Sequence, residues 1–80
     1  MDIEIRVPQF EETDDLPKVV QWLVNIGGKV EVGQDVLEIE TCKALFAIES
    51  PAAGTIRTQM VHEGDPVQPG QLVGILEAAA

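Results

Sequence analysis

Hydrophobic and polar residues alternate along most of the chain, and this period of two predicts β-strands rather than helices. The alternation is clearest at residues 3–7, where Ile3, Ile5 and Val7 are separated by charged residues, and again at 56–60. Shorter apolar segments bounded by glycine, proline or aspartate predict further strands at 31–32, 36–40, 45–49, 66–67 and 72–76. Many short strands at close intervals indicate an all-β sandwich or flattened barrel.

The strand pattern repeats. Sliding the sequence by 37 positions superposes residues 24–40 on 61–77, and seven of those seventeen positions are identical. The identities include turn glycines and the apolar residues between them, so the repeated unit is a plan of strands and turns. Upstream, Pro8 corresponds to Pro51 only if the first copy carries six extra residues within 9–16. The repeat therefore predicts a pseudo-two-fold symmetric fold.

Residues 19–26 are ambiguous on their own, because the proline before them and the glycine after them could also delimit a short helix. The second copy of this segment alternates, and the first is rich in β-branched residues. We therefore expect a strand with Val20, Trp22, Val24 and Ile26 on one side, and Trp22 in the core.

The repeat also predicts where two chemically different segments lie. Glu40 leads into Thr41, Cys42 and Lys43, whereas its counterpart Glu77 leads into three alanines. A two-fold relation places such equivalent segments at opposite ends. The turn that contains Lys43 should therefore face away from residues 78–80.

Composition excludes several function classes. The chain has 80 residues with five Lys plus Arg and fourteen Asp plus Glu, a net charge of −9, and 45% of its residues are hydrophobic. This is apolar enough to fold, too short for a large enzyme, and too acidic for nucleic acid or anionic membranes. The longest apolar run, 44–48, is far below the ~20 residues of a membrane span. We expect a soluble, intracellular domain.

Few residues offer chemistry of their own. One Cys and one His cannot form a disulfide or a structural zinc site, so no metal is expected. His62 lies at a predicted strand end, and we interpret it as a surface histidine rather than a catalytic base. The remaining candidate is Lys43, in the short connection 40–44 between two predicted strands. Taken alone, it would be a solvated surface lysine.

The chain resembles the lipoyl domains of the dihydrolipoamide acyltransferase components of 2-oxo acid dehydrogenase complexes, which are relatives of biotinyl carrier domains. The resemblance covers essentially the whole chain. Its motifs are Val7-Pro8, Gly27-Gly28-Lys29-Val30 with Gly33, Glu40-Thr41-Cys42-Lys43-Ala44, Ser50-Pro51 with Gly54, and Gly64-Asp65-Pro66-Val67 with Gly70.

The resemblance implies a fold and a site. The fold is a barrel-sandwich hybrid of two four-stranded sheets with the lysine on an exposed hairpin turn. Lys43 would carry lipoic acid in amide linkage. Glu40, Thr41, Cys42 and Ala44 would serve recognition by the ligase and by partners. Structural turns would fall at Gly27, Gly33, Gly54, Gly64 and Gly70.

Two residues beside the lysine depart from the family pattern. Cys42 stands where Asp is usual, and Leu45 where a small or polar residue is usual. Cys42 is either a passive replacement or a thiol that exchanges with the neighbouring dithiol. Biotinyl domains flank their lysine with methionines, which this chain lacks. A biotin carrier is therefore the alternative to a lipoyl carrier, and an unmodified β-barrel interaction module is a third possibility.

The inserted segment 9–16 holds a cluster of acids. In the family the loop after the first strand lies close to the lipoyl turn and helps the decarboxylase to choose its carrier. The acids that would serve this recognition are Glu11, Glu12, Asp14 and Asp15. The alternative is a charge run that only keeps the domain soluble.

The resemblance also implies the partners. They are a lipoate ligase or lipoyl transferase, a thiamin-diphosphate 2-oxo acid decarboxylase, the acyltransferase core and dihydrolipoyl dehydrogenase. The domain would be a carrier rather than an enzyme, and a monomer in isolation. We expect residues 1–77 to form the domain and 78–80 to begin an alanine-rich linker. Its location would be cytoplasmic in a bacterium or archaeon and the mitochondrial matrix in a eukaryote.

Overall fold

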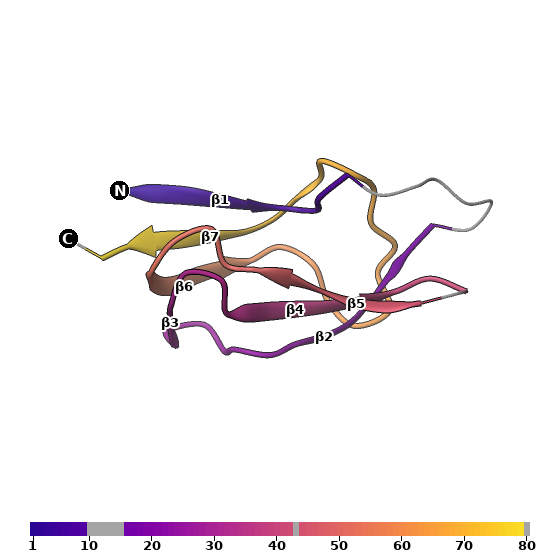
Figure 1. Cartoon of the computed structure of the whole chain (residues 1–80), viewed down its shortest axis with the longest axis horizontal. Helices are drawn as coiled ribbons and strands as arrows, with labels where there is room; N and C mark the ends of the chain where they lie inside the picture. Colours follow the sequence, from indigo (N-terminus) through magenta and orange to yellow (C-terminus); the bar gives the residue numbers. More distant parts are fainter. Residues whose placement is uncertain (10–15, 43, 80) are drawn as a thin grey trace.

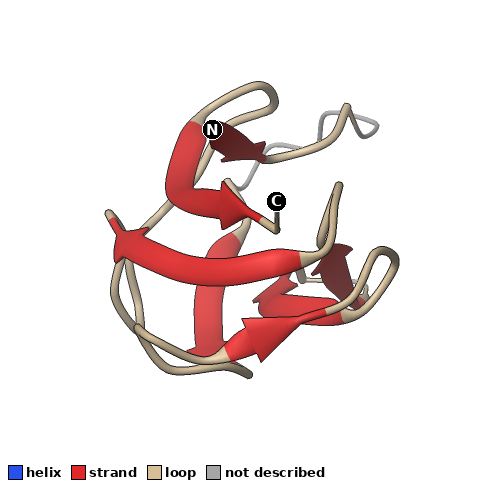
Figure 2. Ribbon diagram, turned by 90° about the vertical axis from the view of Figure 1, so that its left-hand side faces the viewer, coloured by secondary structure: helices blue, strands red, loops and turns tan. Residues whose placement is uncertain are grey.

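The fold consists of β-strands joined by turns. A computed structural model describes residues 1–9, 16–42 and 44–79. Within these ranges it contains strands and loops but no helix (Figure 2). None of the described residues belongs to a helix that is long and apolar enough to cross a membrane. The strands are β1 (Asp2–Arg6), β2 (Lys18–Trp22), β3 (Lys29–Val30), β4 (Asp35–Glu40), β5 (Leu45–Glu49), β6 (Gly54–Gln59) and β7 (Leu72–Ala78).

The strands form two antiparallel sheets. One has four strands in the order β1-β7-β6-β3, and the other has three in the order β2-β4-β5. The expected all-β architecture is confirmed, but the second sheet is one strand short of the prediction. Pro66 forms only an isolated bridge with Lys18. The bonds on both sides of this bridge are made, from the Val19 N–H to Asp65 O at 2.8 Å and from the Val67 N–H to Pro17 O at 2.9 Å, but Pro17 has no N–H to donate in return, so the ladder goes no further.

Pseudo-two-fold symmetry is visible in the hydrogen bonds. The Gly27 N–H donates to Ile56 O at 2.7 Å, and its counterpart Gly64 donates to Val19 O at 2.8 Å. A side-chain pair follows the same rule. Trp22 Nε1 donates to Val61 O at 2.9 Å, and Gln59 Nε2 donates to Val24 O at 2.7 Å. The repeat in the sequence is therefore a repeat in space.

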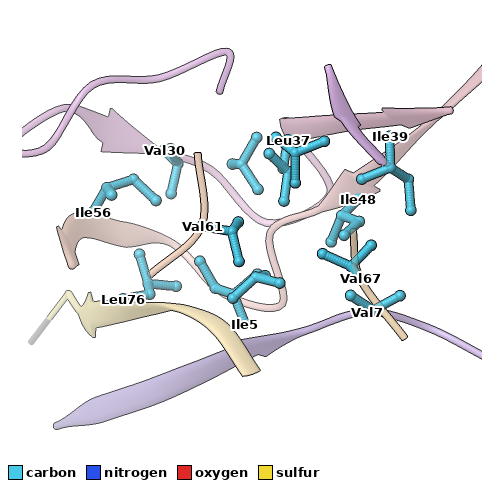
Figure 3. Packing of buried hydrophobic residues seen from close by; sticks show 13 residues of the cluster. Ile5, Val7, Val30, Leu37, Ile39, Ile48, Ile56, Val61, Val67 and Leu76 are labelled. Atoms are coloured by element: carbon cyan, nitrogen blue, oxygen red, sulfur yellow. The ribbon is translucent and has the colours of Figure 1, made fainter. Parts of the chain in front are cut away.

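The core lies between the two sheets. Figure 3 shows side chains from both sheets and from the loops directed toward one another. Ile5 and Leu76 come from the four-stranded sheet, Leu37 and Ile39 from the three-stranded sheet, and all four are at most 1% exposed. The burial of such apolar surface is the main stabilising contribution to a domain of this size.

Strand β2 differs from its prediction. It ends at Trp22, and its pairing with β4 shifts register between Val19 and Gln21. A bulge of this kind interrupts the alternation of faces. Val19 is buried, and Trp22 and Val24 are half-buried against the core, as the prediction for one apolar side required of the last two. Ile26 is 61% exposed because it lies in the turn beyond the end of β2, so the prediction is wrong for this residue.

The molecule is elongated, and its two ends differ. Its principal extents are 41 × 20 × 17 Å. Figure 1 shows both chain termini at one end of the long axis and the connection between β4 and β5 at the other. This confirms that the turn after Glu40 faces away from residue 78. The last strand includes Ala78, and the Ala79 N–H still donates to Ala53 O at 2.9 Å.

Candidate functional site

The candidate site is the hairpin that joins β4 to β5. Ile39 pairs with Phe46, and Glu40 pairs with Leu45. Ile39 is fully buried while Glu40 is exposed, so the alternation that anchors the strand in the core also directs its last residue outward. Residues 41–44 then form a short connection at the end of the molecule. Lys43 lies outside the described residues.

Both ends of this connection are hydrogen-bonded to each other. The Thr41 N–H donates to Ala44 O at 2.8 Å, and the Ala44 N–H donates to Thr41 Oγ1 at 3.1 Å. The hydroxyl also lies 3.4 Å from Ala44 O, as a longer donated bond. Thr41 is thus a structural member of the turn. Threonine hydroxyls commonly bond to backbone groups of their own turn, but the sequence alone did not indicate this bond.

The covalent neighbours of Lys43 are accessible. Cys42, a free thiol, and Ala44 are both exposed. Leu45, the next residue, is 61% exposed although it is a large apolar side chain. An enzyme can therefore approach the described residues of this turn from solvent without breaking core packing, which is what attachment of a prosthetic group to the turn would require.

The end of the acidic segment returns beside the hairpin. Lys18, the first residue of β2, pairs directly with Glu40 at the end of β4. Leu16, two residues earlier, is 49% exposed. The four acids predicted to serve recognition lie outside the described residues: Glu11, Glu12, Asp14 and Asp15. The chain therefore re-enters the fold next to the candidate site, and a role of these acids in recognition stays a prediction.

The described ion pairs occur on only one of the two sheets. The ion pairs Arg6–Glu4 (3.0 Å) and Arg57–Asp2 (2.6 Å) both lie on the four-stranded sheet. Among the residues that the structure describes, no ion pair lies on the three-stranded sheet. That sheet carries its acids at Asp35, Glu38, Glu40 and Glu49, against one cation at Lys18. The three-stranded sheet is consequently net negative, although Asp35 and Glu49 pair at its end away from the hairpin.

Four of the five glycines predicted at turns lie in turns with a left-handed backbone. Their φ angles are positive, a conformation that favours glycine: Gly27 (+89°), Gly33 (+83°), Gly64 (+86°) and Gly70 (+80°). Gly54 is a correction, because it is the first residue of β6 rather than a turn residue. A Cβ at Gly54 would collide with the carbonyl oxygen of Glu77 on β7. Glycine is needed there for close approach of two strands.

His62 and Trp22, which were also considered in the sequence analysis, lie away from the hairpin. His62 is exposed, and its backbone N–H donates to Asp65 Oδ2 at 2.8 Å within a turn. Trp22 is half-buried, and its ring lies over Gly74, where a Cβ would come within 3.0 Å of Cη2. Over the described ranges, no group of three or more His, Cys, Asp or Glu side chains could hold a metal ion.

A small β-domain that presents a hairpin at the end opposite its chain termini can serve as a carrier for a covalently attached group. Comparison with known proteins agrees. The family model Biotin_lipoyl, described as "Biotin-requiring enzyme", matches residues 3–76. The solution structure of the lipoyl domain of the 2-oxoglutarate dehydrogenase complex from Azotobacter vinelandii superposes with a TM-score of 0.74 and 31% identity, over 96% of this chain and 99% of that one. The chain belongs to the biotin/lipoyl family and, within it, to the lipoyl domains.

Two curated relatives are larger proteins. The dihydrolipoyllysine-residue acetyltransferase component of the acetoin cleaving system of Cupriavidus necator is 40% identical over 77 residues, 96% of this chain and 21% of that protein. The dihydrolipoyllysine-residue succinyltransferase component of the 2-oxoglutarate dehydrogenase complex of Bartonella vinsonii is 35% identical over 80 residues, 100% of this chain and 20% of that protein. The chain thus spans about a fifth of either relative.

Proposed function

We propose that the chain is a lipoyl carrier domain in which Lys43 bears lipoic acid in amide linkage. The observation that carries the proposal is the hairpin after Glu40, which lies at the pole opposite the termini and is closed by Thr41 and Ala44. Membership of the lipoyl domains supports it further. At the end of the molecule opposite the termini, an attached arm can reach a partner enzyme without obstruction by the sheets of the domain.

The chain itself supplies an amine and its position. An ordinary lysine amine has a pKa near 10.4, so it is protonated at neutral pH and is a poor nucleophile. A separate ligase or transferase must therefore provide an activated lipoyl group. An amide bond forms between Nζ and the carboxyl carbon, the activating group leaves, and the ammonium loses two of its three protons to solvent or to the ligase. The bound dithiolane then supplies redox and acyl-carrying chemistry.

The partners would act in sequence on the attached arm. A thiamin-diphosphate 2-oxo acid decarboxylase would acylate it, an acyltransferase core would pass the acyl group to coenzyme A, and a flavoprotein dihydrolipoyl dehydrogenase would reoxidise it. The chain would perform none of these reactions by itself. Tethering raises the effective concentration of the arm at each partner without tight binding. The domain would be a monomer, located with its complex in the cytoplasm or the mitochondrial matrix.

Lipoate is favoured over biotin. The residues that flank the lysine are Cys42 and Ala44 rather than methionines. The two curated relatives are both named for a dihydrolipoyllysine residue. Biotin remains the alternative attached group, because the family model covers both kinds of domain.

Competitive loading tests the proposal. The unmodified chain is incubated with a lipoate ligase and a biotin ligase together, with ATP, lipoate and biotin, and its intact mass is measured. We expect one lipoyl increment, lost in Lys43→Arg and kept in the matched variant Lys29→Arg, whose lysine is exposed near the other end. A biotinyl increment, or a lipoyl increment that survives in Lys43→Arg, would contradict the proposal.

A further inference from the structure

We infer that Thr41 is a positioning residue: its hydroxyl holds the connection 41–44 in the conformation in which the ligase accepts Lys43. This inference rests on the proposed function and assigns Thr41 a role different from direct recognition. The hydroxyl accepts the Ala44 N–H at 3.1 Å, in addition to the backbone bond of 2.8 Å from Thr41 to Ala44. Two groups of Thr41 therefore fix Ala44, and Cys42 and Lys43 are the only residues between them.

The pseudo-two-fold symmetry provides an internal comparison. The counterpart of Thr41 is Ala78, and with the six-residue insertion the counterpart of Ala44 is Met1. The Ala78 N–H donates to Met1 O at 2.9 Å, which reproduces the backbone bond of the hairpin. Alanine has no hydroxyl, so the fold closes this pair of strands without one. The Thr41 hydroxyl is thus an addition specific to the end that carries the lysine.

Other turns of the molecule use side chains in the same way, but as symmetric pairs. The Glu31 N–H donates to Gln34 Oε1 at 3.0 Å, and its counterpart Gln68 donates to Gln71 Oε1 at 2.9 Å. These bonds serve the fold, since both halves have them. The bond from Ala44 to Thr41 instead belongs to the exposed hairpin, beyond the buried residues that anchor β4 and β5 in the core.

The Thr41 hydroxyl orders the hairpin before the ligase binds to it. Restricting a short loop before binding lowers the conformational entropy that is lost when an enzyme captures it. A ligase that binds the hairpin in one conformation therefore binds a braced hairpin more tightly, while the chemical step at the amine is unchanged. Loss of the hydroxyl should raise the KM for the carrier and leave kcat near its original value.

Three variants test this inference. Thr41→Val removes the hydroxyl and keeps the shape, Thr41→Ser restores a hydroxyl, and Thr55→Val makes the same change on β6, near the chain termini. For Thr41→Val, the loss of one hydrogen bond predicts a KM for ligation raised roughly 3- to 10-fold and an Ala44 amide that exchanges faster by a similar factor. Thr41→Ser and Thr55→Val should resemble the original chain in both measurements.

The two readouts separate the inference from the function on which it rests. Hydrogen exchange at Ala44 uses the unmodified chain and needs no ligase. If Thr41→Val leaves both the exchange rate and the KM unchanged, or if Thr41→Ser fails to restore them, Thr41 is not a positioning residue. If the ligase modifies no variant, including the original chain, the proposed function fails, and the exchange rates alone decide whether Thr41 braces the turn.

Discussion

At the scale of single residues, Gly33 and Gly54 are required for two different steric reasons. Gly33 has a φ of +83° and open space where a Cβ would lie. Gly54 has an ordinary strand conformation, but its missing Cβ lets β6 approach the carbonyl oxygen of Glu77 on β7. An alanine would strain only the local backbone at the first position, whereas at the second it would force two paired strands apart.

The two alanine variants should therefore differ in stability. We expect Gly33→Ala to lower the free energy of unfolding by about 1–2 kcal/mol through the left-handed backbone alone. Gly54→Ala should cost about 3 kcal/mol or more, because the clash involves backbone atoms that cannot rotate away. Urea unfolding monitored by Trp22 fluorescence measures both. An equal or smaller loss in Gly54→Ala would contradict the assignment of Gly54 to close strand approach.

Trp22 and Gln59 occupy equivalent positions and make equivalent bonds across the two halves. Replacing Trp22 with Phe keeps an aromatic ring but leaves Val61 O without its donor, at an expected cost of about 1–3 kcal/mol. Gln59→Glu, which removes the equivalent donor, should also destabilise the domain. If urea unfolding shows both variants to be as stable as the original chain, the bonds from Trp22 to Val61 and from Gln59 to Val24 do not stabilise the fold.

At the scale of elements, the hairpin and the segment before β2 meet at one end of the molecule, because Lys18 pairs with Glu40. Leu16 and Leu45 are exposed on either side of this pairing, 49% and 61% respectively. The chain therefore leaves the acidic segment and enters β2 directly beside the hairpin. This arrangement supports partner selection by 9–16.

Neutralising the acids of this segment tests partner selection. We expect Glu11→Gln/Glu12→Gln and Asp14→Asn/Asp15→Asn each to lower kcat/KM for reductive acylation about tenfold at low salt, with less effect at high salt because screening weakens charge steering. Glu31→Gln/Glu77→Gln removes two exposed acids at the other end and should leave the rate unchanged. Equal effects of all three pairs would indicate that the segment contributes only net charge.

The strands were predictable where alternate residues pack in the core. Residues 36–40 and 45–49 correspond to β4 and β5, and Leu37, Ile39, Phe46 and Ile48 at alternate positions join the core cluster, while a register shift at the start of β4 buries Val36 as well. The bulge in β2 and the loss of a strand at Pro66 depend on pairing between distant segments, which no local pattern encodes. The motif around Lys43 indicated the candidate site, and the role of Lys43 itself stays a prediction. The bond from Ala44 to the Thr41 hydroxyl requires the folded turn and could not be predicted.

At the scale of the whole molecule, net charge opposes folding. The chain carries −9, and ten of its fourteen acids lie in residues 1–40. The two ion pairs of the described residues are exposed, and pairs of this kind contribute little to stability. Repulsion among the acids should therefore outweigh attraction in the folded state.

Salt should consequently stabilise the domain. We expect the urea midpoint to rise when NaCl is raised from about 0.02 to 0.2 M, because the Debye length shortens from roughly 20 Å to below 10 Å and repulsion is screened. Arg57→Gln, which removes one ion pair and makes the chain more negative, should show a rise at least as large. A midpoint that falls with salt would mean that the ion pairs dominate.

The function proposed for the domain depends on the identity and place of the attached group. The most direct measurement is peptide mapping by tandem mass spectrometry of the chain expressed in cells that contain both lipoate and biotin ligases. We predict a lipoyl increment on Lys43, in the peptide that contains Thr41 to Ala44, and unmodified Lys18 and Lys29. A biotinyl increment on Lys43, a lipoyl group on Lys18 or Lys29, or an unmodified Lys43 would contradict the account.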